Sequence, residues 1–434
     1  MYTAITFLVV NLATLFGLYV DERQRRVLDT KTIPDAAKKF CTQETFDKSR
    51  RYGKEKIVLR MMATLAEHGL FHLVLLGGFV PYCWAAGRRM AGALLCYPAG
   101  CEEETVAAEI FSALFFFLIE GVPSTVLSLP FSLYAVFGIE QRYSFNTQTL
   151  GQFFLDKVKE LFVSVTVLLV LLLVFIPVGR VLLQIASVLT LFFVFWALLV
   201  LFQVAMVVVM QEWILPFFNK FSPLENDELR TKIEKLCTEV RFPLKRIFVM
   251  DGSKRSTHSN AFFIGIGGKK TIVVFDTMLE KLSHEEILAV VAHELGHWHH
   301  NHILLMLLAT QIYTATSLGF FLYLFQCRPL YVSFGIEKEM PFAVGAVLCG
   351  LLYTPLSCVL SFLFNRLSRR NEFQADGFAV EHECGASLKE ALVRLQTENL
   401  SSVVTDRLYS MYNNTHPTLV ERIQHIEARE QKAK

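Results

Sequence analysis

The chain has 434 residues, of which 53% are hydrophobic and 19% charged, and its formal net charge is +2. Soluble globular proteins carry about 25% charged residues, so this composition argues against an ordinary soluble domain. The small net charge, without a basic stripe carrying interleaved aromatic residues, argues against nucleic acid as a partner.

Seven apolar runs are long enough to cross a membrane as helices, because a spanning helix needs roughly 20 mainly apolar residues. The runs cover residues 3–20, 62–86, 107–137, 161–178, 181–209, 303–326 and 341–364. No small-residue cleavage site follows the first run, so we expect a retained helix. Pro123 and Pro130 are expected to kink the third run, and Pro355 is expected to bend the seventh.

The segment between the first two runs, residues 21–56, is rich in lysine and arginine. Positively charged loops favour the cytosolic side of a membrane. We therefore expect this loop in the cytosol and the N-terminus on the luminal side. With seven spans, residues 218–302 and the C-terminal tail also become cytosolic.

Several ionisable residues interrupt the apolar runs, namely Glu67, His68, His72, Glu120 and Arg180, the last of these at the junction of the fourth and fifth runs. Ionisable groups at membrane depth usually face a hydrated cavity or one another. A position at the membrane interface accounts equally well for Glu67 and His68.

The cytosolic stretch 218–302 has the pattern of a small α+β domain. Residues 229–242 predict an amphipathic helix, while 246–252 and 271–279 are β-branched and aromatic runs typical of strands. Residues 259–270 between them predict a further strand that ends in a glycine turn.

The sequence HELGH lies in a predicted helix that starts with a Ser283/Glu286 capping box. His293 and His297 are four residues apart, so both imidazoles leave the same helical face and can bind one cation. Glu294 can then act as the general base on the attacking water, which is the mechanism typical of this spacing. A surface helix with incidental histidines is the alternative. His299, His300 and His302 fall outside the spacing and are expected to form a polar helix end.

A catalytic zinc site takes three protein ligands, so a third is expected on another helix. Glu372 and Asp376 lie four residues apart after the seventh run. Glu372 can complete a His2Glu site, and Asp376 can accept a hydrogen bond from the free N–H of a ligand histidine. A charged, solvated helix next to the membrane explains the same spacing equally well.

His416 precedes Pro417 near the C-terminus, and Arg422 follows six residues later. A histidine held at a turn can donate a hydrogen bond to the oxyanion of a tetrahedral intermediate. An ordinary turn histidine is the simpler alternative for this position taken alone.

Together these segments resemble the type I CAAX prenyl proteases, which are integral-membrane zinc metalloproteases of the gluzincin kind. The most specific matching segments are DGSKRSTHSNAFFIG, HELGHWHHNH, SRRNEFQADGFA and YSMYNNTHPTLVERI. The resemblance implies a mainly α fold, with about seven membrane helices around a large hydrated chamber and a small α+β zinc domain. Thr418 stands where the family often has a second proline, so the local turn is expected to differ.

The resemblance also implies roles for individual residues. His293, His297 and Glu372 would bind one Zn²⁺ per chain, with Glu294 as base. His416 would steady the oxyanion, Asn260 would lie on an edge strand that pairs with the substrate backbone, and Arg422 is grouped with the substrate-binding residues.

The implied division of the chain has four parts. Residues 1–217 would form five membrane helices, 218–302 the zinc domain, 303–364 two further membrane helices, and 365–434 the part that supplies Glu372 and His416.

The implied function is removal of the C-terminal tripeptide from prenylated CAAX proteins by a monomeric enzyme in the lipid of the endoplasmic reticulum membrane. A membrane quality-control metalloprotease that needs no prenyl group is the alternative enzyme. A seven-span receptor or transporter with incidental histidines is the alternative from another class.

Overall fold

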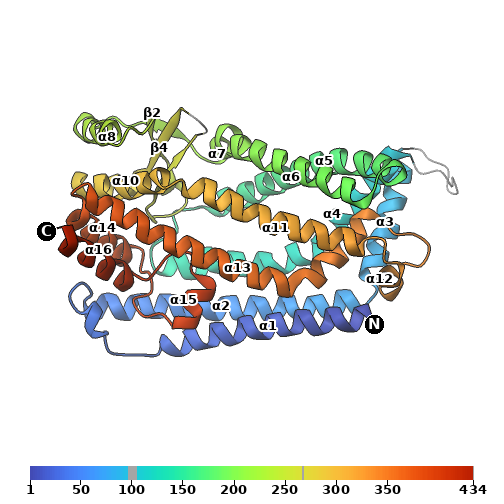
Figure 1. Ribbon diagram of the computed structural model, residues 1–434. Helices are drawn as coiled ribbons and strands as arrows, with labels where there is room; N and C mark the ends of the chain where they lie inside the picture. The colour runs from blue at the N-terminus through green and yellow to red at the C-terminus, as the bar shows by residue number, and fades with distance from the viewer. Residues whose placement is uncertain (96–104, 266–267, 434) are drawn as a thin grey trace.

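The computed structural model describes residues 1–95, 105–265 and 268–433. Its long helices form a bundle that carries a small sheet at one end (Figure 1). The N-terminus lies at the other end, near α3 (Phe79–Leu94) and α12 (Arg328–Ser333). The C-terminal helices α14 (Gly385–Glu398) and α16 (Leu419–Ala433) lie at the sheet end, so the two chain ends are at opposite ends of the bundle.

Within the described residues, seven helical segments are long and apolar enough to cross a membrane, which confirms the predicted number. They are α1 (Tyr2–Val27); α2 (Gln43–Leu76); α4 (Val106–Leu133) with the π-helical η2 (Tyr134–Glu140); α5 (Leu150–Ile185); α6 (Val188–Val209) with η3 (Met210–Ile214) and α7 (Leu215–Phe218); α11 (His302–Leu324); and α13 (Phe342–Glu381).

The outer faces of these helices are apolar. On α1, for example, Leu8, Leu12 and Leu15 are each more than half exposed and follow one another at helical spacing. A long row of leucines on the outer face of an apolar helix suits contact with lipid. The chain is therefore an integral, multi-pass membrane protein.

The predicted bounds of the second run were wrong at both ends. α2 begins at Gln43, well inside the charged loop, and ends at Leu76. Gly78 then adopts a φ of +64°, a left-handed conformation that suits glycine. This turn separates α2 from α3, so the predicted run 62–86 is divided between two helices.

The predicted junction at Arg180 was also wrong. Arg180 lies inside α5 and forms an ion pair of 3.8 Å with Glu109 of α4. α5 ends later, at Ile185, and α6 begins at Val188. Ser187 caps α6 by accepting a hydrogen bond from the Thr190 N–H.

α13 is one helix of 40 residues that passes through Pro355 and continues far beyond the predicted end at 364. Its first part belongs to the bundle, and its last turns reach the sheet end of the molecule (Figure 1). The domain division at residue 364 therefore falls inside a continuous helix, and the proposed division of the chain stays a prediction.

The ionisable residues of α2 have different neighbours. His68 and His72 are both within hydrogen-bonding distance of Asn11 on α1, with N···O and N···N distances of 3.0 and 3.2 Å. Glu67 instead lines a cavity described below. The histidines thus join two membrane helices, which is a common use of polar residues between such helices.

The small sheet has the strand order β1-β2-β4-β3. β2 (Leu244–Met250) and β4 (Lys270–Phe275) are parallel, while β1 (Phe221–Pro223) and β3 (Ala261–Ile264) are antiparallel to their neighbours. β2, β3 and β4 match the three predicted strands; β1 was not predicted. Residues 266–267 of the predicted glycine turn lie outside the described residues.

The helices around the sheet are α8 (Asp227–Glu239), η4 (Gly252–Lys254), α9 (Asp276–Lys281) and α10 (His284–His299). η1 (Asp35–Ala37) lies in the first loop, and α15 (Arg407–Asn413) precedes α16.

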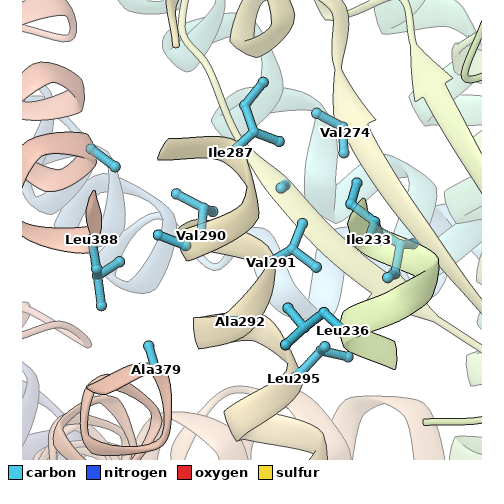
Figure 2. Close-up of a cluster of buried hydrophobic side chains, with 14 of the residues drawn as sticks. Ile233, Leu236, Val274, Ile287, Val290, Val291, Ala292, Leu295, Ala379 and Leu388 are labelled. Carbon is cyan, nitrogen blue, oxygen red and sulfur yellow. The ribbon is translucent and has the colours of Figure 1, made fainter. Parts of the chain in front are cut away.

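α10 is central to the core at this end (Figure 2). Its side chains Val291 and Leu295 face Ile233 and Leu236 of α8, while Val290 faces Leu388 of α14. Val291, Ala292 and Leu295 are fully buried. Burying a valine or leucine side chain contributes about 1.5–3 kcal/mol, so this packing holds α10 firmly between the sheet layer and the C-terminal helices.

Candidate metal centre and active site

The predicted HELGH helix is α10. Ser283 and Glu286 form the predicted capping box, in which the Ser283 N–H donates to Glu286 at 2.7 Å and the Glu286 N–H donates to Ser283 Oγ at 3.3 Å. His293 and His297 lie on one face of this helix, with their Nε2 atoms 3.2 Å apart. The capped, buried helix therefore presents two imidazole nitrogens at one point.

The third predicted ligand reaches the same point from α13. Glu372 Oε1 lies 3.3 Å from His297 Nε2, and Glu372 Oε2 lies 3.5 Å from His293 Nε2. Among the described residues, these three form the group of side chains whose ligand atoms lie close enough to hold a metal ion. Tetrahedral zinc with bonds of about 2.0–2.1 Å needs ligand atoms about 3.3 Å apart. The His2Glu set therefore fits zinc in both chemistry and spacing.

Asp376 lies one turn beyond Glu372 and contacts His293 from the other side. The Nδ1 atom of His293 is 2.9 Å from Asp376 Oδ1, as the spacing predicted. Burial and the nearby Arg422 lower the pKa of His293, but hydrogen bonds to Asp376 and Glu372 outweigh them and raise it to about 9. A donor histidine held by a carboxylate is oriented with its Nε2 towards the ligand group.

Arg422, on α16, binds Asp376 with two hydrogen bonds of 2.6 and 3.0 Å. Its Nη1 also lies 3.6 Å from Glu372 Oε2, and its side chain is only 12% exposed. The arginine thus neutralises part of the charge of two buried carboxylates. The substrate contact expected of Arg422 stays a prediction; its observed ion pairs are with the carboxylates.

Glu294 is half-buried beside the two histidines. Burial raises the pKa of its carboxyl, although the neighbouring His293 and His297 oppose that rise. A carboxylate whose pKa is raised towards neutral pH is better suited to take and return a proton. The position and environment of Glu294 are therefore compatible with the predicted base.

His416 lies at the open side of the ligand group, with its side chain 64% exposed and its Nδ1 2.9 Å from Glu372 Oε2. Arg369 holds the loop that carries it. The Arg369 guanidinium donates to the His416 carbonyl at 3.1 Å, to Ser410 Oγ at 2.8 Å, and to Glu421 by two bonds of 3.0 Å. The position of His416 is thus set from α13, the helix that carries Glu372.

Thr418, at the position where the family often has proline, immediately precedes α16. Its N–H and hydroxyl donate to Glu421 Oε2 at 2.7 and 2.9 Å, and its Oγ1 accepts from the Glu421 N–H at 3.4 Å. This is a second capping box. The threonine therefore supports the turn after His416 by hydrogen bonds.

The prediction that His302 is a polar helix end was wrong. His302 is 3% exposed, and its Nδ1 lies 2.9 Å from Nδ1 of His297. His299 and His300 are exposed, as expected. The signal for this contact was Asn301, a residue type that tolerates the left-handed conformation seen between α10 and α11.

Asn260 immediately precedes β3, which is an edge strand of the sheet and packs beside α10. Asn260 is exposed, and its backbone carbonyl accepts a hydrogen bond from the Phe275 N–H at 3.0 Å. β3 is an edge strand, as expected, but Asn260 lies one residue before it and not on it. The substrate role of Asn260 stays a prediction.

A cavity of about 960 Å³ opens beside His416. It is lined by stretches of α2, α4, η2 and the loop around residues 399–405, and Glu67 is one of its wall residues. The wall includes apolar residues such as Leu59 and Phe131 as well as polar ones. The cavity wall is therefore neither wholly polar nor wholly apolar.

The sequence did not indicate a polar cluster in the wall of this cavity. His258 lies 3.4 Å from Glu140 and 3.1 Å from Asn399, while the Tyr52 hydroxyl donates to Glu140 at 2.6 Å. These residues come from α2, η2, the loop before β3 and the end of α14. Their contacts connect the membrane helices to the sheet end next to the ligand group.

Comparisons with known proteins agree with this architecture. The family described as peptidase family M48 matches residues 223–430, and the one described as CAAX prenyl protease N-terminal, five membrane helices, matches residues 24–220. A CAAX prenyl protease 1 homolog of Arabidopsis thaliana is 37% identical over 100% of this chain and 98% of its own length. The Homo sapiens homolog is 33% identical, covering 96% and 93%. A crystal structure of S. mikatae Ste24p superposes with a TM-score of 0.90 at 32% identity, covering 98% of this chain and 99% of that one.

Proposed function

The chain belongs to the CAAX prenyl proteases of peptidase family M48 and is a membrane metalloendopeptidase, and from this membership we propose that it removes the C-terminal tripeptide from prenylated CAAX proteins. The names of the relatives support the substrate class, since those proteins are CAAX prenyl proteases. The site supports the reaction class, because it combines a His2Glu ligand set with an adjacent carboxylate.

His293, His297 and Glu372 would hold one zinc ion, consistent with their mutual distances of 3.2 to 3.5 Å. When bound, zinc supplies Lewis acidity that activates a water and polarises the scissile carbonyl. Asp376 keeps His293 in the orientation needed for binding, and Arg422 limits the repulsion between the Asp376 and Glu372 carboxylates.

Glu294 takes a proton from the attacking water and later gives it to the leaving amine. His416 steadies the negative oxygen that develops on the carbonyl carbon. The His416 Nδ1 lies 2.9 Å from Glu372 Oε2, and a ring N–H of His416 donates to this developing negative oxygen. Arg369 holds the His416 loop at the open side of the ligand group, so the donor is in place before the charge develops.

The substrate backbone adds as a further strand to the edge of the sheet at β3, beside Asn260. The C-terminal end of the substrate then lies next to His416, at the mouth of the 960 Å³ cavity. The apolar part of the wall suits a prenylated cysteine, which an aqueous active site would exclude.

The catalytic end faces the cytosol, and the enzyme resides as a monomer in the endoplasmic reticulum membrane. The loop between α1 and α2 is rich in basic residues and lies at the sheet end of the bundle. Such loops are retained on the cytosolic side, and CAAX proteins are made there.

The observation that carries the proposal is the convergence of His293, His297 and Glu372 next to Glu294 in a multi-pass membrane chain. The test uses the purified full-length protein in detergent, with one CAAX peptide in farnesylated and unmodified forms. Mass spectrometry follows release of the tripeptide. Because burial of each CH₂ contributes about 0.8 kcal/mol, we expect kcat/KM to be at least about tenfold higher for the farnesylated form.

The Glu294→Gln protein, prepared identically, controls for contaminating proteases. Equal cleavage of the two peptides would replace the proposal by a quality-control protease that ignores the prenyl group. No cleavage of either peptide by the zinc-loaded wild-type protein would overturn the proposed activity.

A further inference from the structure

The ligand His297 is the first member of a hydrogen-bonded chain of three side chains. Its Nδ1 lies 2.9 Å from Nδ1 of His302, and Nε2 of His302 lies 3.0 Å from Oε1 of Gln374. His302 is 3% exposed, and Gln374 is partly buried on α13. His297 lies on α10, His302 is the first residue of α11, and Gln374 lies on α13. The hydrogen-bonded chain therefore connects three helices.

The turn between α10 and α11 brings His302 to this place. The φ of Asn301 is +55°, in the left-handed region that asparagine tolerates better than most residues. This residue interrupts the helix after α10, and α11 starts at His302 and continues in the same general direction along α13 (Figure 1). After this interruption the ring of His302 lies beside His297, with the two Nδ1 atoms 2.9 Å apart.

The chemistry of each atom decides the direction of the hydrogen bonds. The amide oxygen of Gln374 can only accept, so Nε2 of His302 must carry the hydrogen. A neutral histidine has one N–H group, and Nδ1 of His302 is therefore an acceptor. It accepts the Nδ1–H of His297, which leaves Nε2 of His297 without a hydrogen.

That bare nitrogen is the atom that faces the ligand group. Nε2 of His297 lies 3.2 Å from Nε2 of His293 and 3.3 Å from Oε1 of Glu372. If the Gln374 amide were reversed, its NH₂ would donate to His302, and the chain would put a hydrogen on Nε2 of His297. A protonated Nε2 cannot bind a metal.

We propose that His302 and Gln374 are positioning residues that hold His297 in its metal-binding tautomer and ring orientation. This rests on the proposed function only in taking His297 as a zinc ligand. The ring orientation of the other ligand, His293, is held by a carboxylate, that of Asp376. The second histidine is held by neutral groups, so it gains the same orientation without another negative charge in a pocket that already contains three carboxylates, those of Glu294, Glu372 and Asp376.

The test measures zinc affinity of the purified full-length protein by competition with a chromophoric chelator. Gln374→Met removes the strong acceptor at similar size, and His302→Phe removes both ring nitrogens. Loss of a group that orients a ligand histidine typically costs 10–100-fold in metal affinity, so we expect losses of about that size. Gln374→Glu keeps an acceptor and should bind zinc within about threefold of wild type.

His299→Asn is the matched control, because His299 is exposed on the same helix end and its ring lies against Trp298, His300 and Phe378. Rescue by glutamate but not by methionine separates orientation from mere packing. If His302→Phe does not fold, the comparison of zinc affinity between Gln374→Met and Gln374→Glu still tests the proposal.

Wild-type affinity in Gln374→Met, or equal losses in Gln374→Met and Gln374→Glu, would overturn the proposal, as would a wild-type protein that binds no zinc. Cleavage of the farnesylated peptide is measured separately. A wild-type protein that binds zinc tightly but leaves this peptide intact would contradict the proposed function, while the affinity ratios would still decide the roles of His302 and Gln374.

Discussion

Gly296 of α10 packs against the backbone of Ala375 of α13. A Cβ atom at Gly296 would lie 2.9 Å from the Ala375 Cα and 3.0 Å from its carbonyl oxygen. The next residue after Gly296 is the ligand His297, and Glu372 is three residues before Ala375. α10 and α13, which carry the ligands, therefore meet at a glycine, because a residue with a Cβ atom would not let their backbones come so close.

Gly296→Ala is expected to push α10 and α13 apart and to lower stability by about 1–3 kcal/mol, the usual cost of overpacking. Zinc affinity should fall as well, because Glu372 moves with α13. Thermal unfolding in detergent and zinc competition measure both effects. Gly151→Ala is the control, since a Cβ at Gly151 meets no atom of the described residues within 4 Å. Unchanged unfolding and zinc affinity in Gly296→Ala would contradict this account.

Glu294→Gln is expected to keep zinc but to lose cleavage by about 10²–10⁴-fold, because an amide cannot accept the proton of the attacking water. Metal content by atomic absorption and peptide cleavage are measured on the same preparation. Glu285→Gln, at an exposed acid in the first turn of α10, should cleave like wild type. Wild-type activity in Glu294→Gln would exclude this residue as the base.

Arg369→Gln is expected to lower kcat by about 10²-fold while zinc affinity stays unchanged, because the loop of His416 loses the bonds that position an oxyanion donor. The exposed neighbour Arg370 provides the control substitution Arg370→Gln. In a double variant with His416→Ala, the loss should not exceed that of His416→Ala alone. Additive losses would show that Arg369 acts independently of His416.

Asn399 and Asn413 begin two glycosylation sequons, Asn-Leu-Ser and Asn-Asn-Thr, at the sheet end of the molecule. If this end faces the cytosol, both stay unmodified in eukaryotic cells, since the transfer occurs in the lumen. Treatment with an endoglycosidase should leave the electrophoretic mobility unchanged. A sequon in an N-terminal tag, expected in the lumen, should be glycosylated; the opposite pattern would reverse the proposed orientation.

The features that could be predicted from sequence have local causes. A spanning helix needs a long apolar run, so the number of spans could be counted, and an i, i+4 histidine pair such as His293 and His297 shares a face on any helix. The Ser283 cap has the same local character. Joining Glu372 to this pair required the family resemblance, because spacing alone described a solvated helix equally well.

The missed features depend on contacts between distant parts of the chain. α2 extends back to Gln43, where Thr42 caps it and where Phe46, Tyr52 and Ile57 are buried among its charged residues; hydropathy detects only the apolar part. β1 is three residues long and contains Pro223, so it has no strand pattern of its own. His302 was assigned to the surface because a left-handed residue between two helices redirects a side chain in a way that spacing rules do not capture.

α13 carries Glu372 thirty residues after Phe342, with no break in the helix between them. At 1.5 Å per residue this is a lever about 45 Å long, so a tilt of about 2° at its membrane end would displace the carboxylate by roughly 1.5 Å. Helices adjust their tilt to bilayer thickness. A bilayer thickness that changes the tilt of α13 would therefore displace Glu372 relative to His293 and His297, which lie on α10.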